Sequence, residues 1–388
     1  MSAPVVRVSP KGASRIASGH PWIFASDVLD HGTAAPGDSV TVVDAKGRAL
    51  GTAHYSSTSK ICLRLLSDRV EPIDREFLLG RLRAAIEYRK RHVAGTEAYR
   101  LVHSEADRLP GLIVDRYGDF LSVQMLSQGM DRAGSVILDC LQELLAPAGV
   151  VARNDSPVRA HESLPVGSTV LAGDVPERVQ VGINGLRFSV DILKGQKTGF
   201  FLDQRENYAA VARHARGRAL DCFTFEGGFA LHMAGSCESV EAVDSSEPAL
   251  RLARENSQAN GIANVEFRQA DVFDLLAGYV PAGRRFDTIV LDPPGFAKSR
   301  GAVEGALRGY RDLNLRALRL LSSGGVLVTC SCSHHVSEAM LLETVASASL
   351  DAGRTLCVIE RRTQALDHPI LLTVPETHYL KCLVFELV

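Results

Sequence analysis

Residues 218–250, RALDCFTFEGGFALHMAGSCESVEAVDSSEPAL, decide the fold. An apolar run, RALDCF, is followed by two glycines in a helix-like stretch, GGFALHMAG, and then by a second apolar run, VEAVDSS. Apolar runs that alternate with helical segments predict parallel strands joined by crossover helices. The alternation continues from about residue 194 to the end of the chain, so this half predicts a doubly wound α/β sheet. The last two runs, TLCVIERR and HYLKCLVFELV, lack a full helix between them, and the final strand is therefore predicted to be antiparallel.

The first half of the chain has a different pattern. Residues 4–66 contain short β segments broken by turn residues, which predict a small barrel. Residues 74–93 predict a helix with an apolar stripe and a basic face that carries Arg81, Arg83, Arg89, Lys90 and Arg91. The remaining segments predict strands over 99–125, a helix over 131–147, turns over 154–177 and a hairpin around Asn-Gly over 179–192.

Composition and charge limit the class of protein. The 388 residues are 46% hydrophobic and 23% charged, which is typical of a globular protein, and no apolar run approaches the roughly 20 residues that span a bilayer. The first residues do not resemble a signal peptide, so a cytoplasmic protein without a membrane partner is expected. Residues 1–100 hold 15 basic against 10 acidic residues, a net +5, and the rest sums to −7. This asymmetry indicates either a polyanion-binding first half or merely a solvated surface.

Acidic residues follow successive predicted strands. Gly227 and Gly228 lie at the first strand–helix junction, where glycine permits close approach of a ligand to the backbone. Asp244 ends the next strand and suits a ribose diol, and Asp271 ends the third and suits an adenine amine. The alternatives are an ordinary strand–helix turn and solvated helix caps. Because no G-x-G-x-x-G fingerprint is present, a nucleoside site here favours S-adenosylmethionine (SAM) over a dinucleotide.

The fourth strand ends in LDPPGFAKSR, residues 291–300. Two prolines after Asp292 form a stiff exit without backbone donors, which leaves carbonyls and the ring of Phe296 to face a planar base. A rigid loop with a helix cap is the alternative. In this position the string indicates methylation of a nucleic-acid base.

The fifth strand delivers a cluster of two cysteines and two histidines, TCSCSHH, to the same edge. A zinc site needs four ligands, and no second pair with metal-ligand spacing exists in the sequence. A disulfide between Cys330 and Cys332 would be strained. A single thiolate is the stronger chemical hypothesis, because carbon 5 of a pyrimidine becomes nucleophilic only after addition at carbon 6. Two small residues that pack under a helix remain the alternative.

Together these strings resemble a family. The chain is similar to bacterial class I SAM-dependent methyltransferases with an N-terminal PUA domain, which methylate carbon 5 of a cytosine in 23S ribosomal RNA. The resemblance covers essentially the whole length. Its most specific pieces are KGQKTGFFLDQREN (194–207), the glycine turn, VDSSEPAL (243–250), LDPPGFAKSR (291–300), GYRDLN (309–314), SCSHH (331–335) and DHPILLTVPETHYLK (367–381).

The resemblance implies a PUA domain over 1–72, a central α+β domain over 73–188 and a Rossmann-like catalytic domain over 189–388. It implies that Cys332 is the nucleophile, that Asp292 assists it, and that Cys330 packs in the strand. Cofactor-binding residues are expected to be Phe201, Gln204, Arg205, Asp221, Phe223, Gly227, Gly228, Asp244, Ser245, Asp271, Val272 and Asp292. Substrate-binding residues are expected to be Pro293, Pro294, Phe296, Lys298, Arg89, Lys90 and Arg91.

The expected partner is 23S ribosomal RNA, either free or in a large-subunit assembly intermediate, and the sequence leaves a homodimer open. The fourth-strand motif of related two-cysteine enzymes carries a second cysteine, where this chain has Gly295. The base that removes the ring proton is therefore not identified, and His334 is the nearest candidate. Two alternatives are methylation of a purine or exocyclic nitrogen, which needs no cysteine, and a SAM- and RNA-binding assembly factor without activity.

Overall fold

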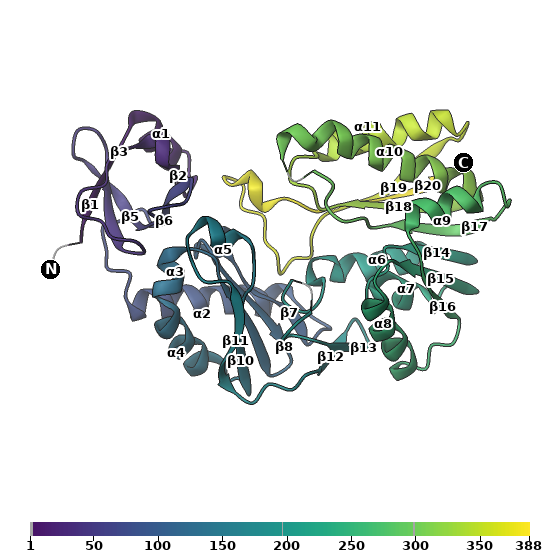
Figure 1. The fold of residues 1–388 in the computed structure, drawn as a ribbon, viewed down its shortest axis with the longest axis horizontal. Coiled ribbons are helices and arrows are strands. Elements are labelled where there is room, and N and C mark those ends of the chain that lie inside the picture. Colours follow the sequence, from purple (N-terminus) through teal and green to yellow (C-terminus); the bar gives the residue numbers. More distant parts are fainter. Residues whose placement is uncertain (1–2, 196, 298) are drawn as a thin grey trace. The chain divides into compact units, whose positions relative to one another are not determined.

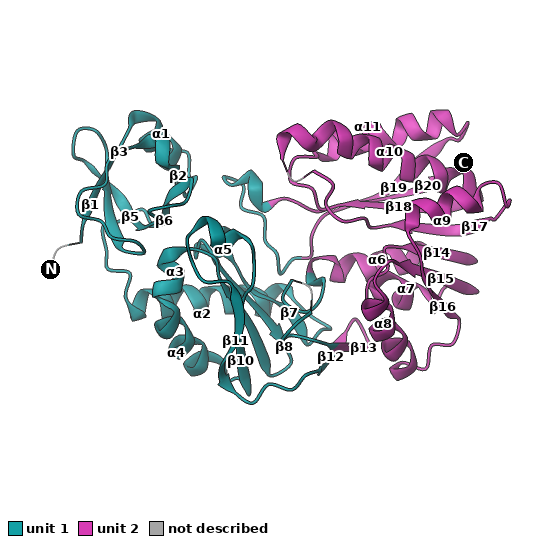
Figure 2. Ribbon diagram, in the orientation of Figure 1, with its two compact units in different colours: residues 1–181, 190–202, 366–377 teal, residues 182–189, 203–365, 378–388 magenta. Residues whose placement is uncertain are grey.

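The computed structural model describes residues 3–195, 197–297 and 299–388. The chain divides into two compact units, coloured separately in Figure 2. Unit 1 comprises residues 1–181, 190–202 and 366–377, and unit 2 comprises residues 182–189, 203–365 and 378–388. The division into domains at residues 72 and 188 stays a prediction.

The N-terminal part of unit 1 is a six-stranded sheet with the order β2-β6-β5-β4-β1-β3. Its elements are β1 (Val5–Val8), α1 (Pro10–Ala17), β2 (Trp22–Phe24), β3 (Val28–Asp30), β4 (Ser39–Val43), β5 (Ala49–Tyr55) and β6 (Ile61–Ser67). Val6, Val40 and Leu63 are among the side chains that fill its core. The β segments predicted over residues 4–66 are confirmed, and α1, which Ser9 caps, was not predicted.

A second sheet of unit 1 has the order β11-β10-β9-β8-β7 and packs against helices. Its elements are α2 (Arg75–His92), β7 (Ala98–His103), β8 (Leu112–Tyr117), β9 (Phe120–Met125), α3 (Gln128–Arg132), α4 (Gly134–Leu145), β10 (Gly149–Asn154), α5 (Val158–His161) and β11 (Gly167–Gly173). The turn-rich segment 154–177 is interrupted by β11, which was not predicted and pairs with β10 as an exposed antiparallel edge strand.

The predicted hairpin around Asn-Gly is formed by β12 (Val179–Ile183) and β13 (Leu186–Val190). Asn184 has φ 51° and Gly185 has φ 86°, the left-handed backbone that a two-residue hairpin turn requires.

Unit 2 contains a seven-stranded sheet with the order β16-β15-β14-β17-β18-β20-β19. Its strands are β14 (Arg218–Cys222), β15 (Ser239–Asp244), β16 (Val265–Gln269), β17 (Phe286–Leu291), β18 (Leu321–Ser331), β19 (Leu356–Arg362) and β20 (Lys381–Leu387). The strands β14 to β18 pair in parallel, and β20 is antiparallel to both its neighbours. The predicted doubly wound sheet with an antiparallel last strand is confirmed.

Helices cover both faces of this sheet (Figure 1). They are α6 (Arg205–His214), α7 (Gly228–Met233), α8 (Glu247–Ala259), α9 (Val272–Tyr279), α10 (Val303–Leu320) and α11 (Glu338–Asp351). Leu276 of α9, Leu313 of α10 and Leu341 of α11 pack with Ile289 and Leu327 of the sheet in one buried core. Short 3-10 turns are η1 (Ala25–Asp27), η2 (Ser104–Asp107), η3 (Leu202–Gln204), η4 (Arg300–Ala302) and η5 (Pro375–Thr377). Among the described elements, no helix combines the length and the apolar character needed to cross a membrane.

A buried ion pair anchors the second sheet of unit 1. The guanidinium of Arg100 contacts both carboxylate oxygens of Asp115, at 2.8 and 2.9 Å. Thr198 Oγ1 donates to the same carboxylate, and the amide of Phe200 donates to Tyr117 Oη at 3.0 Å. These contacts fasten the segment 190–202 to strand β8.

We expect Asp115→Ala to lower the free energy of unfolding by about 3–5 kcal/mol, because it removes a buried carboxylate that contacts two nitrogens of the Arg100 guanidinium. Asp119→Asn is a matched control, since its carboxyl is exposed and lies 4.0 Å from Arg116, and it should change stability by less than about 0.5 kcal/mol. Urea unfolding measures both variants. Equal stability of the two would show that the buried pair contributes nothing.

Candidate active site

The candidate site lies at the carboxyl edge of the unit 2 sheet. Strands β14 and β17 are neighbours although two strands and three helices separate them in the chain. The sheet order reverses between them, and open α/β sheets bind ligands at such a point. The last residues of β14, β17 and β18 are Cys222, Leu291 and Ser331, so the loops that follow these strands meet at this edge.

The turn after β14 has an unusual backbone. Phe223 and Phe225 have φ values of 66° and 51°, a left-handed conformation that is rare for bulky residues and concentrates at functional sites. Gly227 also has a positive φ, of 86°. A Cβ on Gly228 would lie 2.5 Å from the ring of Tyr208, so this position admits only glycine. The two predicted glycines therefore keep the turn close to the sheet.

Asp221 lies beneath this turn and is fully buried. Its Oδ2 accepts hydrogen bonds from Thr224 Oγ1 at 2.6 Å and from the amide of Ala230 at 2.9 Å. Its Oδ1 has no hydrogen-bond partner among the described residues. Burial raises the pKa of Asp221 to about 7, and the nearby carboxylate of Asp292 adds to the increase. A cationic ligand would relieve this cost.

The other two predicted acids lie at the end of β15 and two residues beyond the end of β16. Asp244 ends β15, and its carboxylate accepts from the amides of Phe225 at 2.9 Å and Ser246 at 2.8 Å, while Ser245 beside it is exposed. Asp271 is exposed and caps α9 through the amide of Asp274 at 3.1 Å. The side chain of Val272 belongs to the hydrophobic core, so only its backbone could meet a ligand.

The predicted cofactor residues before β14 divide between the units. Gln204 is buried, and its Nε2 donates to Asp292 Oδ2 at 3.1 Å, which joins it to the site. Arg205 is also buried, and its guanidinium lies 3.3 Å from Glu206 Oε1. Phe201 lies in unit 1 with the Lys197 ammonium 4.3 Å from its ring centre. Its cofactor role stays a prediction.

The DPPGF loop follows β17 directly. Asp292 is half-buried, and its amide donates to the carbonyl of Cys222 on β14 at 3.3 Å. Pro293 is buried, Pro294 is exposed and the Phe296 ring is half-exposed, so one proline and the ring face solvent. Lys298, a predicted substrate residue, lies outside the described residues.

Cys332 lies beside this loop. The amide of Ala297 donates to Ser333 Oγ at 3.2 Å, which ties the two loops together. A Cβ built on Gly295 would lie 3.4 Å from Cys332 Sγ, so the thiol faces the loop in van der Waals range. Cys330 is fully buried opposite Cys382 in the β18–β20 ladder, and burial raises the pKa of its thiol. Its predicted packing position agrees with this geometry.

A metal site and a disulfide are the two other chemistries that the sequence raised for this cluster. Cys330 and Cys332 are both thiols and not disulfide partners. In the part of the chain that the structure describes, no three His, Cys, Asp or Glu side chains are grouped to hold a metal ion. A cavity of about 460 Å³ is lined by Phe273, Phe296, η4 and the start of α10, but it does not include Cys332 or Asp292.

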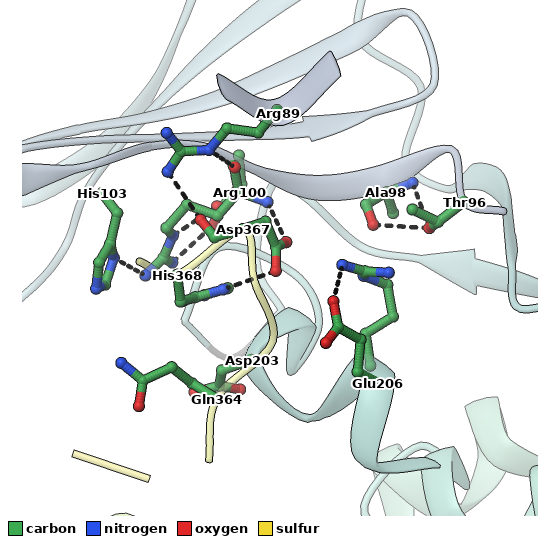
Figure 3. A network of polar contacts seen from close by, with 12 residues as sticks. Arg89, Thr96, Ala98, Arg100, His103, Asp203, Glu206, Gln364, Asp367 and His368 are labelled. Carbon is green, nitrogen blue, oxygen red and sulfur yellow. Dashed lines mark hydrogen bonds and ion pairs between the residues drawn. The ribbon is translucent and has the colours of Figure 1, made fainter. Parts of the chain in front are cut away.

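The basic helix α2 is only partly available for RNA. The Arg89 guanidinium is buried and donates to the carbonyls of Arg100 at 2.9 Å and Asp367 at 2.8 Å (Figure 3). It also pairs with the carboxylate of Asp107. The prediction that Arg89 contacts the substrate is therefore corrected, because its charge is satisfied inside unit 1. Lys90 and Arg91 are exposed, and Lys90 lies 2.8 Å from Glu87.

Three side chains that were assigned no role complete the site. Tyr208 packs under Gly228, Tyr310 donates to Ser331 Oγ at 2.9 Å, and Lys381 donates to the Ser333 carbonyl at 2.7 Å. Tyr310 lies in the motif GYRDLN and Lys381 in the motif DHPILLTVPETHYLK, both of which carry the family resemblance. The sequence alone does not indicate which residues these two side chains contact.

These residues fit SAM. A buried carboxylate with an unpartnered oxygen, a glycine turn that no larger side chain could form, and Asp244 at the second strand end suit a cationic nucleoside ligand. In this site Gln204, Asp221, Asp244 and Asp271 would hold the cofactor, which supplies a methyl group. The sheet order and this edge together define the class I methyltransferase fold.

Comparisons with known proteins support this fold class. The family model of the S-adenosylmethionine-dependent methyltransferases matches residues 112–386, and that of the PUA-like domain matches residues 6–68. Ribosomal RNA large subunit methyltransferase I of Aeromonas salmonicida is 42% identical over 94% of both chains, and its counterpart in Aeromonas hydrophila is 41% identical over 99% of both. A methyltransferase structure from Streptococcus mutans is 20% identical with a TM-score of 0.84, and it covers 99% of this chain and 100% of its own. The chain therefore belongs to the SAM-dependent methyltransferases, in the family called ribosomal RNA large subunit methyltransferase I.

Asp244→Asn should weaken SAM binding about 10- to 100-fold, because a carboxylate that accepts hydrogen bonds from a ligand contributes more than a neutral amide. Isothermal titration calorimetry measures the dissociation constant. The control is Asp274→Asn, which changes an exposed acid near the same edge and should leave the affinity unchanged. Equal affinities in the two variants would remove Asp244 from the site.

SAM binding should release a proton near pH 7. The pKa of Asp221 is raised to about 7, so about half of this carboxyl is protonated at that pH, and a bound cation favours the ionised form. At pH 9 the carboxyl is already ionised, and the release should vanish. Calorimetry in two buffers of different ionisation enthalpy counts the protons, and Asp221→Asn is the control. Proton uptake at pH 7, or the absence of any proton exchange at that pH, would contradict this prediction.

Proposed function

We propose that this methyltransferase forms 5-methylcytosine in large-subunit ribosomal RNA through a covalent adduct with Cys332. The observation that carries the proposal is the position of Cys332 Sγ against Gly295 of the DPPGF loop. The substrate class is supported by relatives named ribosomal RNA large subunit methyltransferase I, which align over 94% or more of the chain.

The chemistry follows from this arrangement. The target cytosine leaves its stack and lies against Pro294 and the ring of Phe296. The Cys332 thiolate adds to carbon 6, which makes carbon 5 nucleophilic toward the methyl group. Asp292, held by Gln204, polarises the edge of the base. A base then takes the proton from carbon 5, and the electron pair of that bond re-forms the double bond between carbons 5 and 6 and expels the thiolate. His334 is the candidate for this base.

Unit 1 supplies contacts to the RNA backbone. A PUA-like domain and the exposed Lys90 and Arg91 of α2 suit phosphates, which contribute affinity without sequence specificity. In this proposal the protein acts in the cytoplasm, as a monomer or a homodimer, and has three domains, 1–72, 73–188 and 189–388. Its substrate is ribosomal RNA, either free or within a large-subunit assembly intermediate.

Nucleoside mass spectrometry of ribosomal RNA, treated with the protein and labelled SAM, tests the product. We expect labelled 5-methylcytosine. A methylated purine or N4-methylcytosine would instead support the nitrogen-methylating alternative, and RNA without label would support a binding factor without activity.

Cys332→Ala should reduce methyl transfer by at least about 10⁴-fold, because no covalent adduct can form, while its affinity for SAM stays unchanged. Cys330→Ala is the matched control, since it removes a thiol two residues away that lies in the core. It should keep activity and lose only stability. An active Cys332→Ala with an inactive Cys330→Ala would reverse the assignment.

A further inference from the structure

Lys381 is a buried cation beside the candidate nucleophile. Its side chain is almost fully buried, and Nζ donates to the carbonyls of Ser333 at 2.7 Å and Tyr379 at 2.8 Å. No carboxylate of the described residues forms an ion pair with it. A buried lysine without such a partner is costly and uncommon, so a function is the expected reason for its presence.

The sheet places this amine next to Cys332. Lys381 pairs with Ser331 across the β18–β20 ladder, and its side chain reaches the carbonyl of Ser333. The side chain of Lys381 therefore runs alongside residues 331–333, and Cys332 is the residue in the middle of this segment. Burial lowers the pKa of Lys381 to about 8, while the charges of Cys332 and, to a smaller extent, Glu338 oppose this decrease. From α10, Tyr310 also senses the charge of Cys332.

We propose that Lys381 is the proton partner of Cys332: its neutral amine takes the thiol proton, and the resulting ammonium stabilises the thiolate. The S–H bond breaks and an N–H bond forms, so the pair exchanges one proton and keeps its total charge. Only the use of this thiolate at carbon 6 rests on the proposed function. Because Lys381 acts through Cys332, it is a positioning residue for the nucleophile.

The hydrogen bonds of Lys381 suit both protonation states. A neutral amine has two N–H donors, which match the two carbonyls, and its lone pair is left to accept a proton. The ammonium keeps both bonds and gains a third donor. His334 is a weaker candidate for this exchange, because its side chain is exposed and its ring lies 5.4 Å from that of Tyr379.

The test is the pH profile of alkylation at Cys332 in the full-length protein. Iodoacetamide reacts with thiolates, and peptide mass spectrometry separates Cys332 from Cys357, which is exposed on β19 and serves as the internal reference. The midpoint of a pH profile does not depend on accessibility. In the native protein we expect Cys332 to have a lower midpoint than Cys357, and an equal or higher midpoint would overturn the proposal.

Three variants separate charge from packing. Lys381→Arg keeps a cation and should keep the low midpoint, while Lys381→Gln keeps a hydrogen-bond donor without charge, and Lys381→Met keeps neither. In the two neutral variants the Cys332 midpoint should rise by about one pH unit, with roughly tenfold slower alkylation at pH 7 and no change at Cys357. An unchanged midpoint in Lys381→Gln would show that the lysine only ties the loop to the strand.

Melting temperature and SAM affinity show whether the variants are folded. If Lys381→Met does not fold, the Cys332 midpoints of Lys381→Arg, Lys381→Gln and the native protein are sufficient to test the proposal. The product assay separates the two proposals. If the Cys332 midpoint rises in the neutral variants but no 5-methylcytosine forms, the proton exchange between Lys381 and Cys332 is supported and attack at carbon 6 is rejected. If 5-methylcytosine forms but the midpoint does not rise, only the role of Lys381 is rejected.

Discussion

The pairing of β14 with β17 is the constraint on which the candidate site depends. These strands come from distant parts of the chain, and their pairing places Asp221 and Asp292 in one neighbourhood. The amide of Asp292 bonds to the carbonyl of Cys222, so the loop leaves the sheet only beyond that residue. The resulting mutual repulsion, added to burial, keeps the pKa of Asp221 near 7 and prepares the site for a cationic ligand.

The hydroxyl groups of Ser333 and Tyr310 hold Cys332 and the DPPGF loop in place at this edge of the sheet. Ser333 Oγ accepts the amide of Ala297 and lies 3.3 Å from Tyr310 Oη, which itself donates to Ser331 Oγ. These bonds join α10, the end of β18 and the DPPGF loop. As a consequence Cys332 faces Gly295, and its position is set by buried side chains that take no part in the chemistry.

Sequence periodicity predicted the strands of unit 2 and the residues at their ends, because the alternation of apolar and helical segments is local information. It missed α1 and β11, which is a mostly exposed edge strand. It could not predict the left-handed Phe223 and Phe225, since their conformation is imposed by the surrounding turn. Arg89 was assigned to the exposed basic face because of its charge. Its spacing from Leu82 and Ala85 instead places it on the buried stripe of α2.

The direction of the last strand explains why a cation lies close to the segment that carries Cys332. A parallel strand in the place of β20 would begin at the opposite edge of the sheet. Because β20 is antiparallel, its first residue, Lys381, lies beside the last residue of β18. Its partners there are carbonyls, which, unlike a carboxylate, add no negative charge to hold the proton on the amine. In the proposed reaction one thiolate forms and is regenerated in each cycle, which requires a proton partner whose affinity for the proton is close to that of the thiol. The antiparallel strand and the carbonyl ligands give Lys381 the position and the surroundings that this proposed role requires.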